Sequence, residues 1–194
     1  MEKLAREFFD RDTLTVARDL LGCQLVRVLN GQALVCRITE TEAYIGRCDK
    51  ACHAYGYKRT TRTETLFARP GTAYVYLIYG MYNCLNFVTE PEGEPAAVLI
   101  RGLEAVDGLE TMQKLRYPKH TGELTSYQKK NFLNGPGKLC KALSIDRSLN
   151  GLDLTGDTMY VVRSGPAPSR IHSGPRIGID YAEEAVDFPW RFWI

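Results

Sequence analysis

Apolar and polar residues alternate in two neighbouring segments near the N-terminus, residues 23–29 and 32–44. A period of two is typical of strands that bury one face. Asn30 and Gly31 join the two segments, and this dipeptide favours a type I′ turn because both residues tolerate positive φ. The pattern therefore predicts an antiparallel hairpin, preceded by a helix over residues 12–21 that starts at a good N-cap, an aspartate.

Further apolar segments follow a polar and basic stretch at residues 48–69, which we expect to be a long functional loop. Three of them predict strands, at residues 73–79, 83–89 and 96–103. Helical spacing and helix-end residues predict helices, near residues 109–115 and 135–143. Two late strands are predicted around a Pro/Gly/Ser-rich loop at 165–175, over residues 159–163 and 176–179. The predicted fold is α+β, with a curved and mostly antiparallel sheet flanked by helices.

Size and composition fit one globular domain over residues 1–194, because 44% of the residues are hydrophobic and 25% are charged. A formal net charge of +2 is too small to identify a nucleic-acid binder, so a local basic patch has to be sought. The sequence has no secretory signal and no apolar stretch of membrane-spanning length. We therefore expect a soluble protein of the cytoplasm, or of the nucleoid in a prokaryote, with no membrane partner.

Six cysteines are spread along the chain, and a core of this size does not need disulfides. Cys48, Cys52 and His53 are the one group with a spacing that resembles metal ligands. No CxxC pair or second ligand cluster accompanies them, so we expect no metal site.

Two glutamates stand near the end of the predicted hairpin, in the segment Glu40-Thr41-Glu42-Ala43-Tyr44. Alternation places Glu40, Glu42 and Tyr44 on one face. Carboxylates that share a face raise each other's pKa, and an apolar neighbour raises it further, which is how a general base is tuned. On spacing alone, an exposed edge strand with solvated glutamates is the more common explanation.

Tyrosines are concentrated in residues 74–82, around the turn predicted at Gly80-Met81. Tyr74 and Tyr76 share a face and are ordinary candidates for sheet packing. A rigid aromatic side chain such as Tyr79 at the tip of a hairpin is harder to explain by packing. Proteins that distort DNA insert apolar side chains into the base stack, and Tyr79 with Met81 is placed for such a role.

Basic residues lie in the long loop and near the Gly135-Pro136-Gly137 helix start. We expect three of them to contact DNA phosphates: Arg59, Arg62 and Lys138. Each of these residues, taken singly, could equally well be an ordinary basic residue of a protein surface. Arg101 follows the apolar run 98–100 near the end of a strand, and a buried arginine requires a carboxylate or phosphate partner.

Several motifs together resemble the monofunctional 3-methyladenine (alkyladenine, methylpurine) DNA glycosylase family over nearly the whole chain. They are ETEAY at 40–44 with His53, GTAYVYLIYGMY at 71–82, LIR at 99–101, GLETM at 108–112, GPGKLC at 135–140, RIGI at 176–179 and WRF at 190–192. The resemblance implies an open, curved sheet similar to the C-terminal domain of methionyl-tRNA formyltransferase. It also implies a protein that uses no metal or other cofactor.

The resemblance further implies a role for individual residues. Glu42 would be the general base that activates water, and Arg101 and the backbone carbonyl of Ile177 would hold that water. The pocket for the flipped base would be formed by four side chains, Tyr44, His53, Tyr76 and Asn86. Tyr79 would fill the gap left in the duplex. The implied partner is double-stranded DNA that contains damaged purines such as 3-methyladenine, 7-methylguanine or hypoxanthine. We expect a monomer, which is natural for an enzyme that must scan DNA.

Three alternatives remain open on the sequence. The protein could be a glycosylase with lyase activity, in which Lys138 forms a Schiff base. It could be a module that binds lesions without catalysis. A zinc deaminase is the third, but its His-x-Glu and Pro-Cys-x-x-Cys signature is missing.

Overall fold

A long antiparallel hairpin, β2 (Gln24–Leu29) and β3 (Gln32–Ile45), lies at the centre of the computed structural model, which describes residues 2–194. Leu29 pairs with Gln32, and Asn30 and Gly31 have φ of 51° and 80°. Positive φ at both turn residues is the type I′ geometry. The predicted hairpin is confirmed.

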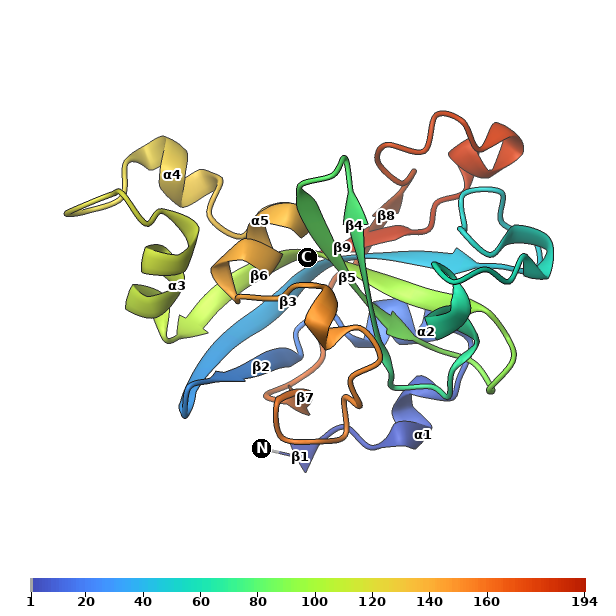
Figure 1. The fold of residues 1–194 in the computed structure, drawn as a ribbon, viewed down its shortest axis with the longest axis horizontal. Coiled ribbons are helices and arrows are strands. Elements are labelled where there is room, and N and C mark those ends of the chain that lie inside the picture. The colour runs from blue at the N-terminus through green and yellow to red at the C-terminus, as the bar shows by residue number, and fades with distance from the viewer. Residues whose placement is uncertain (1) are drawn as a thin grey trace.

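The hairpin is part of a sheet in which every pairing among the described residues is antiparallel (Figure 1). Its order is β1-β7-β2-β3-β6-β5-β4, and β9 adds to β3 and carries β8. The remaining strands are β1 (Glu2–Lys3), β4 (Ala73–Ile78), β5 (Tyr82–Val88), β6 (Ala96–Asp107), β7 (Met159–Arg163), β8 (His172–Gly174) and β9 (Arg191–Trp193). The sheet is curved and does not close into a barrel, as predicted for this α+β fold.

Helices flank this sheet, and their ends follow local chemistry. They are α1 (Arg6–Phe9), α2 (Thr13–Asp19), α3 (Leu109–Arg116), α4 (Ser126–Lys130) and α5 (Pro136–Ala142). Asp12 caps α2 through the Thr15 amide, as predicted, and Pro136 stands at the first turn of α5. Short 3₁₀ turns occur at Tyr55–Tyr57, Glu64–Phe67, Arg147–Leu149 and Glu183–Asp187. No helix in residues 2–194 is long and apolar enough to cross a membrane.

The strand predicted at residues 176–179 and two predicted strand boundaries were wrong. Residues 176–179 do not form a strand, because the Arg176 side chain is held by a buried carboxylate and Gly178 has a φ of 75°. The strand in this region is β8, inside the segment predicted as a loop. The β4–β5 turn begins one residue early, since Tyr79 itself has a φ of 52°. Strand β6 continues to Asp107, so that Arg101 lies in its middle.

Alternation along β5 and β6 sends side chains into two different layers. Leu85 and Phe87 on β5 join the main core, together with Val98 and Ile100 on β6. The residues between them face the other side, where a second cluster forms under the long loop from Cys52, Ala54, Leu66, Phe67, Tyr74, Val88 and Ala97. The sheet therefore separates the main core from the face on which the polar site is built.

Truncation of Phe87 tests the main core. Its ring is fully buried and meets Phe9 of α1 edge to face, at 6.1 Å between ring centroids. We expect Phe87→Ala to lower the free energy of unfolding in urea by about 3–5 kcal/mol through lost burial and the cavity left behind. The exposed β6 residue Val106 provides the control, and Val106→Ala should change it by less than about 0.5 kcal/mol. An equal effect of both changes would contradict this assignment of the core.

Candidate active site

A pocket of about 400 Å³ opens on the polar face of the sheet. Its floor is formed by strands β3 to β6, and its sides by the loop after β3 and by the segment 177–181. Figure 1 shows the β4–β5 hairpin standing beside this segment, which is coloured red. The lining includes Glu42, Arg101, Ile177 and five of the six other pocket and intercalation residues predicted from the sequence, which are Tyr44, His53, Tyr76, Asn86 and Tyr79.

Glu42 is fully buried at the floor of this pocket. The Tyr44 hydroxyl donates a hydrogen bond to Oε2 at 2.7 Å, and the Ile177 backbone N–H donates to Oε1 at 2.9 Å. The Arg101 Nε lies 3.6 Å from Oε1. A buried carboxylate needs such partners, because transfer of an unpaired charge from water is very unfavourable.

Burial is the main influence on the Glu42 carboxyl and raises its pKa above the ordinary value. The Arg101 charge and the hydrogen bonds from Tyr44 and Ile177 oppose this, whereas Glu40 adds to it. A carboxylate that is ionised but has a raised proton affinity is suited to accept a proton from water. Glu40 raises the pKa of Glu42, as predicted, whereas Tyr44 lowers it through its hydroxyl and does not raise it as an apolar neighbour.

Glu40 and Glu42 lie on one face of β3, as predicted, but their surroundings differ. Glu40 Oε1 is 3.3 Å from Arg101 Nε and 3.0 Å from Arg191 Nη1. Its side chain is engaged by two arginines and does not line the pocket. Glu42 is thus the one of these two carboxylates that lines the pocket.

Local irregularity in β6 aims Arg101 at both carboxylates. Opposite β3, Glu40 pairs with Gly102 and Thr41 with Ile100, so Arg101 is an extra residue at a bulge. Bulges commonly reorient a side chain beside a functional site. A Cβ on Gly102 would lie only 2.9 Å from the Glu40 Cβ, so glycine permits the close approach.

Aromatic rings form one side of the pocket. The His53 ring meets Tyr76 edge to face at 4.6 Å between centroids, and the rings of Tyr74 and Tyr76 are 5.3 Å apart. Burial, with a smaller contribution from the Arg62 charge, lowers the pKa of His53 to about 4. His53 is therefore a neutral ring at pH 7 that can stack on a base and offer a hydrogen bond.

Asn86 is a buried residue of β5 that lines the pocket, and its Nδ2 donates to the Tyr74 carbonyl at 3.1 Å. Cys52 is buried and lines the pocket, whereas Cys48 is exposed and lies outside it. Within residues 2–194, no three His, Cys, Asp or Glu side chains are grouped so that they could hold a metal ion.

The hairpin tip projects above the pocket. Tyr79 is 79% exposed and lines the pocket mouth, and Met81 is 67% exposed. Tyr79 has a positive φ of 52°, which is unusual for a bulky residue and is maintained only where the surroundings require it. Both residues predicted to enter DNA thus point away from the packed core.

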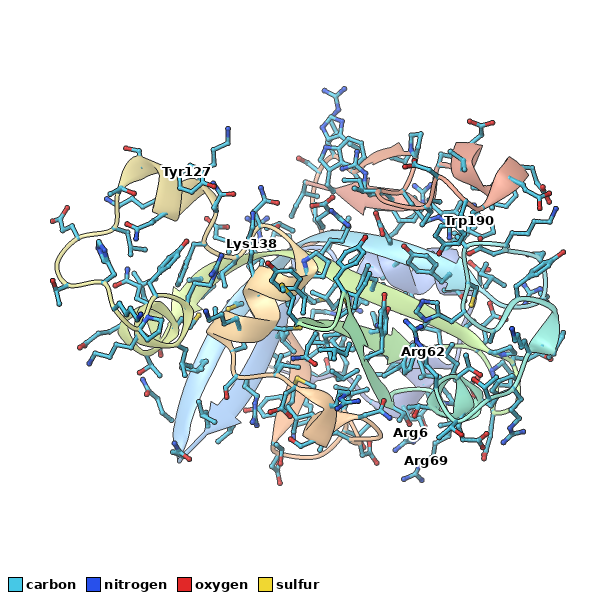
Figure 2. The ribbon with its side chains drawn as sticks, turned by 45° about the horizontal axis from the view of Figure 1, so that its top comes forward. Arg6, Arg62, Arg69, Tyr127, Lys138 and Trp190 are labelled. Atoms are coloured by element: carbon cyan, nitrogen blue, oxygen red, sulfur yellow. The ribbon has the colours of Figure 1, made fainter. Side chains whose placement is uncertain are left out.

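The three predicted phosphate contacts lie at different places. Arg62 lies over the Tyr76 ring at 5.3 Å, while Arg59 forms an ion pair with Glu64 at 2.6 Å. Lys138 donates to Asn131 Oδ1 at 2.7 Å and lines a separate hollow with Arg116 and Lys141. In Figure 2, Lys138 is near Tyr127 at the α4–α5 end, and Arg62 is on the side of the long loop.

Sequence reasoning missed the group that holds the Ile177 side of the pocket. Asp49 forms a fully buried ion pair with Arg176, whose guanidinium also lies over the Tyr44 ring at 4.7 Å. Asp49 is one of two acidic residues in a mostly basic loop, which was a weak signal for a buried partner.

Comparison with known proteins gives a match over almost the whole chain. The sequence profile of the methylpurine-DNA glycosylase (MPG) family matches residues 7–194. The chain belongs to this family. It is accordingly a DNA glycosylase, a hydrolase of N-glycosyl bonds that acts in DNA repair.

Bacterial relatives of this methylpurine-DNA glycosylase are similar over the same length. The chain is 57% identical to a protein of Clostridium perfringens (strain SM101 / Type A), over 99% of this chain and 95% of the relative. It is 54% identical to one of Alkaliphilus oremlandii (strain OhILAs), with the same coverage, and 52% to one of Desulfitobacterium hafniense (strain Y51), over 100% and 96%. Each relative carries the provisional name 3-methyladenine DNA glycosylase.

Burial of the Glu42 charge has a consequence for the stability of this glycosylase. The pKa of Glu42 is higher in the folded protein than in the unfolded chain, so the folded state binds the proton more tightly and stability falls as pH rises through this interval. Glutamine carries no charge at any pH, and Arg101 keeps Glu40 as a partner. We expect Glu42→Gln to raise the free energy of unfolding at neutral pH.

The gain should disappear below the ordinary glutamate pKa of 4.5, where wild-type Glu42 is protonated in both states. Urea unfolding of both proteins at a series of pH values measures the difference. A Glu42→Gln protein that is less stable than the wild type at neutral pH, or equally stabilised at all pH values, would contradict the raised pKa.

Proposed function

We propose that this protein is a monofunctional glycosylase that flips alkylated or deaminated purines out of duplex DNA. The bound purines would include 3-methyladenine, 7-methylguanine and hypoxanthine, and a water activated by Glu42 hydrolyses the N-glycosidic bond. The observation that carries the proposal is a fully buried carboxylate at the floor of an aromatic pocket, with a raised pKa. The names of the bacterial relatives support 3-methyladenine as one substrate.

The chemistry of base excision requires few protein groups. Cleavage of the bond from C1′ to a purine nitrogen develops positive charge on the sugar, which a nearby carboxylate stabilises while it deprotonates the attacking water. Glu42 serves both purposes. The Arg101 charge opposes the rise in the Glu42 pKa and so favours the ionised form, and the Ile177 N–H orients the carboxylate through one hydrogen bond. We propose that the carbonyl of Ile177 holds the water.

Selection of damaged purines follows from the ring system of the pocket. An alkylated purine is electron-poor and often cationic, so it is attracted by aromatic rings that line the pocket. Such a base is already a good leaving group and does not require an acid from the protein. A neutral His53, with its pKa lowered to about 4, adds no positive charge that would repel the base.

Binding to the duplex involves the hairpin tip and the surrounding basic groups. A flipped base leaves a gap, and the exposed Tyr79 ring at the pocket mouth is placed to fill it. Arg62 at the pocket and the cationic hollow that contains Lys138 are suited to phosphates on either side of the lesion. One pocket with one hairpin tip constitutes a complete site, so we propose that a monomer is active.

The alternative of a lyase mechanism has less support. Such a mechanism would require the Lys138 amine. The Lys138 Nζ donates a hydrogen bond to Asn131, and Lys138 does not line the pocket that holds Glu42. A Schiff base with C1′ requires the amine beside the flipped nucleotide. Water is the nucleophile that fits this pocket.

Substitution of Glu42 tests its role as the general base. We expect Glu42→Gln to retain the affinity for a duplex with one hypoxanthine or 3-methyladenine, because shape and volume are preserved. Excision should fall at least about 100-fold, the lower range for loss of a general base. Release of the free purine under single-turnover conditions measures this, alongside the binding constant.

The exposed glutamate Glu104 provides a matched control, since Glu104→Gln removes the same charge from the same sheet. Its excision rate should equal that of the wild type. Normal turnover by Glu42→Gln would remove Glu42 from the mechanism, and binding without release by the wild type would favour a lesion-binding module.

Replacement of the hairpin-tip aromatic tests insertion into DNA. We expect Tyr79→Ala to weaken the binding of lesion-containing duplex by about 1–3 kcal/mol through lost base stacking. Tyr127 on α4 is 75% exposed and outside the pocket, so Tyr127→Ala is the control and should bind as the wild type does. Unchanged lesion affinity of the Tyr79→Ala protein in a fluorescence titration would assign Tyr79 no part in DNA binding.

A further inference from the structure

The ion pair between Asp49 and Arg176 joins two segments that are distant in sequence. Both side chains are fully buried, and the two nitrogens Nη1 and Nη2 contact the two carboxylate oxygens at 2.5 and 2.8 Å. A buried pair of this kind is a weak source of stability, because desolvation offsets most of the attraction. Its value lies in the geometry that it fixes.

The remaining contacts of Arg176 involve both terminal nitrogens, whereas its buried Nε has no hydrogen-bond partner among the described residues. Nη1 also donates to the Ala43 carbonyl at 2.8 Å, and Nη2 to the Ala185 carbonyl at 3.2 Å. The guanidinium plane lies between the rings of Tyr44 and Trp190, at 4.7 and 5.1 Å. Only a planar fork with several donors satisfies these partners together, so lysine is not an equivalent residue.

Both ends of the ion pair lead directly to the pocket. Ile177 follows Arg176 in the chain, and its N–H is the donor to Glu42 Oε1. On the other side, Asp49 Oδ1 accepts a hydrogen bond from the Ala51 amide at 2.9 Å, and Ala51 lines the pocket. The pair therefore fixes the positions of both side walls relative to the carboxylate between them.

We propose that Asp49 and Arg176 are positioning residues, whose ion pair holds the Ile177 amide against Glu42 and fixes the two pocket walls together. Neither residue touches the reacting atoms. This inference rests on the proposed function, since it assigns the pair a purpose in the same site. It extends that function by two residues that act through Glu42.

Several charged or polar groups lie near Glu42. They are Glu40 and Tyr44 on β3, Cys84 on β5, Arg101 on β6, the Ile177 amide and Arg176 of the ion pair itself, with Arg191 on β9 bound to Glu40. The ion pair is neutral as a whole, so removing both charges leaves the net charge near Glu42 unchanged. What changes is the placement of the amide, and loss of a donor to the charged form raises the pKa of a carboxyl.

The variant Asp49→Asn/Arg176→Gln removes the pair without leaving a buried charge unpaired. We expect carbon-13 NMR of the free protein to show the Glu42 carboxyl titrating about one pH unit higher than in the wild type, the size of a lost hydrogen bond to a charged group. Glu42→Gln assigns the resonance. The acidic limb of the pH profile of the single-turnover excision rate should move to higher pH by the same amount, which is about a tenfold loss of rate at a given pH on that limb.

A remote ion pair gives the control. Arg6 and Asp153 join the N-terminal segment to the loop before β7 and do not line the pocket. Arg6→Gln/Asp153→Asn should leave both the Glu42 titration and the pH profile at their wild-type positions. A loss of stability alone would lower the amount of active protein in either variant, without moving its pH profile.

The two proposals fail in different ways. Release of damaged base by the wild type, with an unshifted Glu42 titration in the double variant, would overturn the positioning role. A shifted titration together with no base release by the wild type would overturn the proposed function and leave the effect on Glu42 standing. If the double variant does not fold, Arg176→Lys replaces it: the same upward shift supports the proposal, and an unchanged Glu42 pKa overturns it.

Discussion

The candidate active site depends on one carboxyl group that is held inside the protein. Glu42 is fully buried, and burial opposes its charge more strongly than any other influence. Two hydrogen bonds and one nearby charge compensate: the Tyr44 hydroxyl on the same strand and the Ile177 amide donate to the carboxylate, and the Arg101 guanidinium at the β6 bulge lies 3.6 Å from it. A charge supported in this way is destabilising for the fold, and carboxyl groups with a perturbed pKa are typical of active sites, which fits the general-base role that we propose for Glu42.

The sheet makes this arrangement possible by separating two environments. Alternation on β5 and β6 directs Phe87 and Ile100 into the main core, and directs Asn86 and Leu99 toward the pocket. Rigid strands therefore carry the polar floor, while loops carry the walls. The hairpin tip with Tyr79 lies at the rim, where a projecting side chain can reach a ligand too large to enter.

Local patterns predicted the parts of the site that depend on local structure. The Asn30-Gly31 turn and period-two alternation were sufficient to place Glu40, Glu42 and Tyr44 on one face. The family resemblance then distinguished the two glutamates, which spacing alone could not do. Residues 176–179 were predicted wrongly as a strand because their conformation is imposed by Asp49, 127 positions away from Arg176. Long-range ion pairs leave no periodic signal, and neither does a bulge such as the one at Arg101.

The products formed from damaged DNA test the central claim most directly. A duplex with one 3-methyladenine is incubated with the wild-type protein, and both the freed purine and the damaged strand are analysed, with and without borohydride. Hydrolysis by a Glu42-activated water predicts one free purine for each abasic site, an unbroken strand and no trapped protein–DNA adduct. A borohydride-trapped adduct or a cleaved strand would show that an amine of the protein is the nucleophile, and would contradict the account.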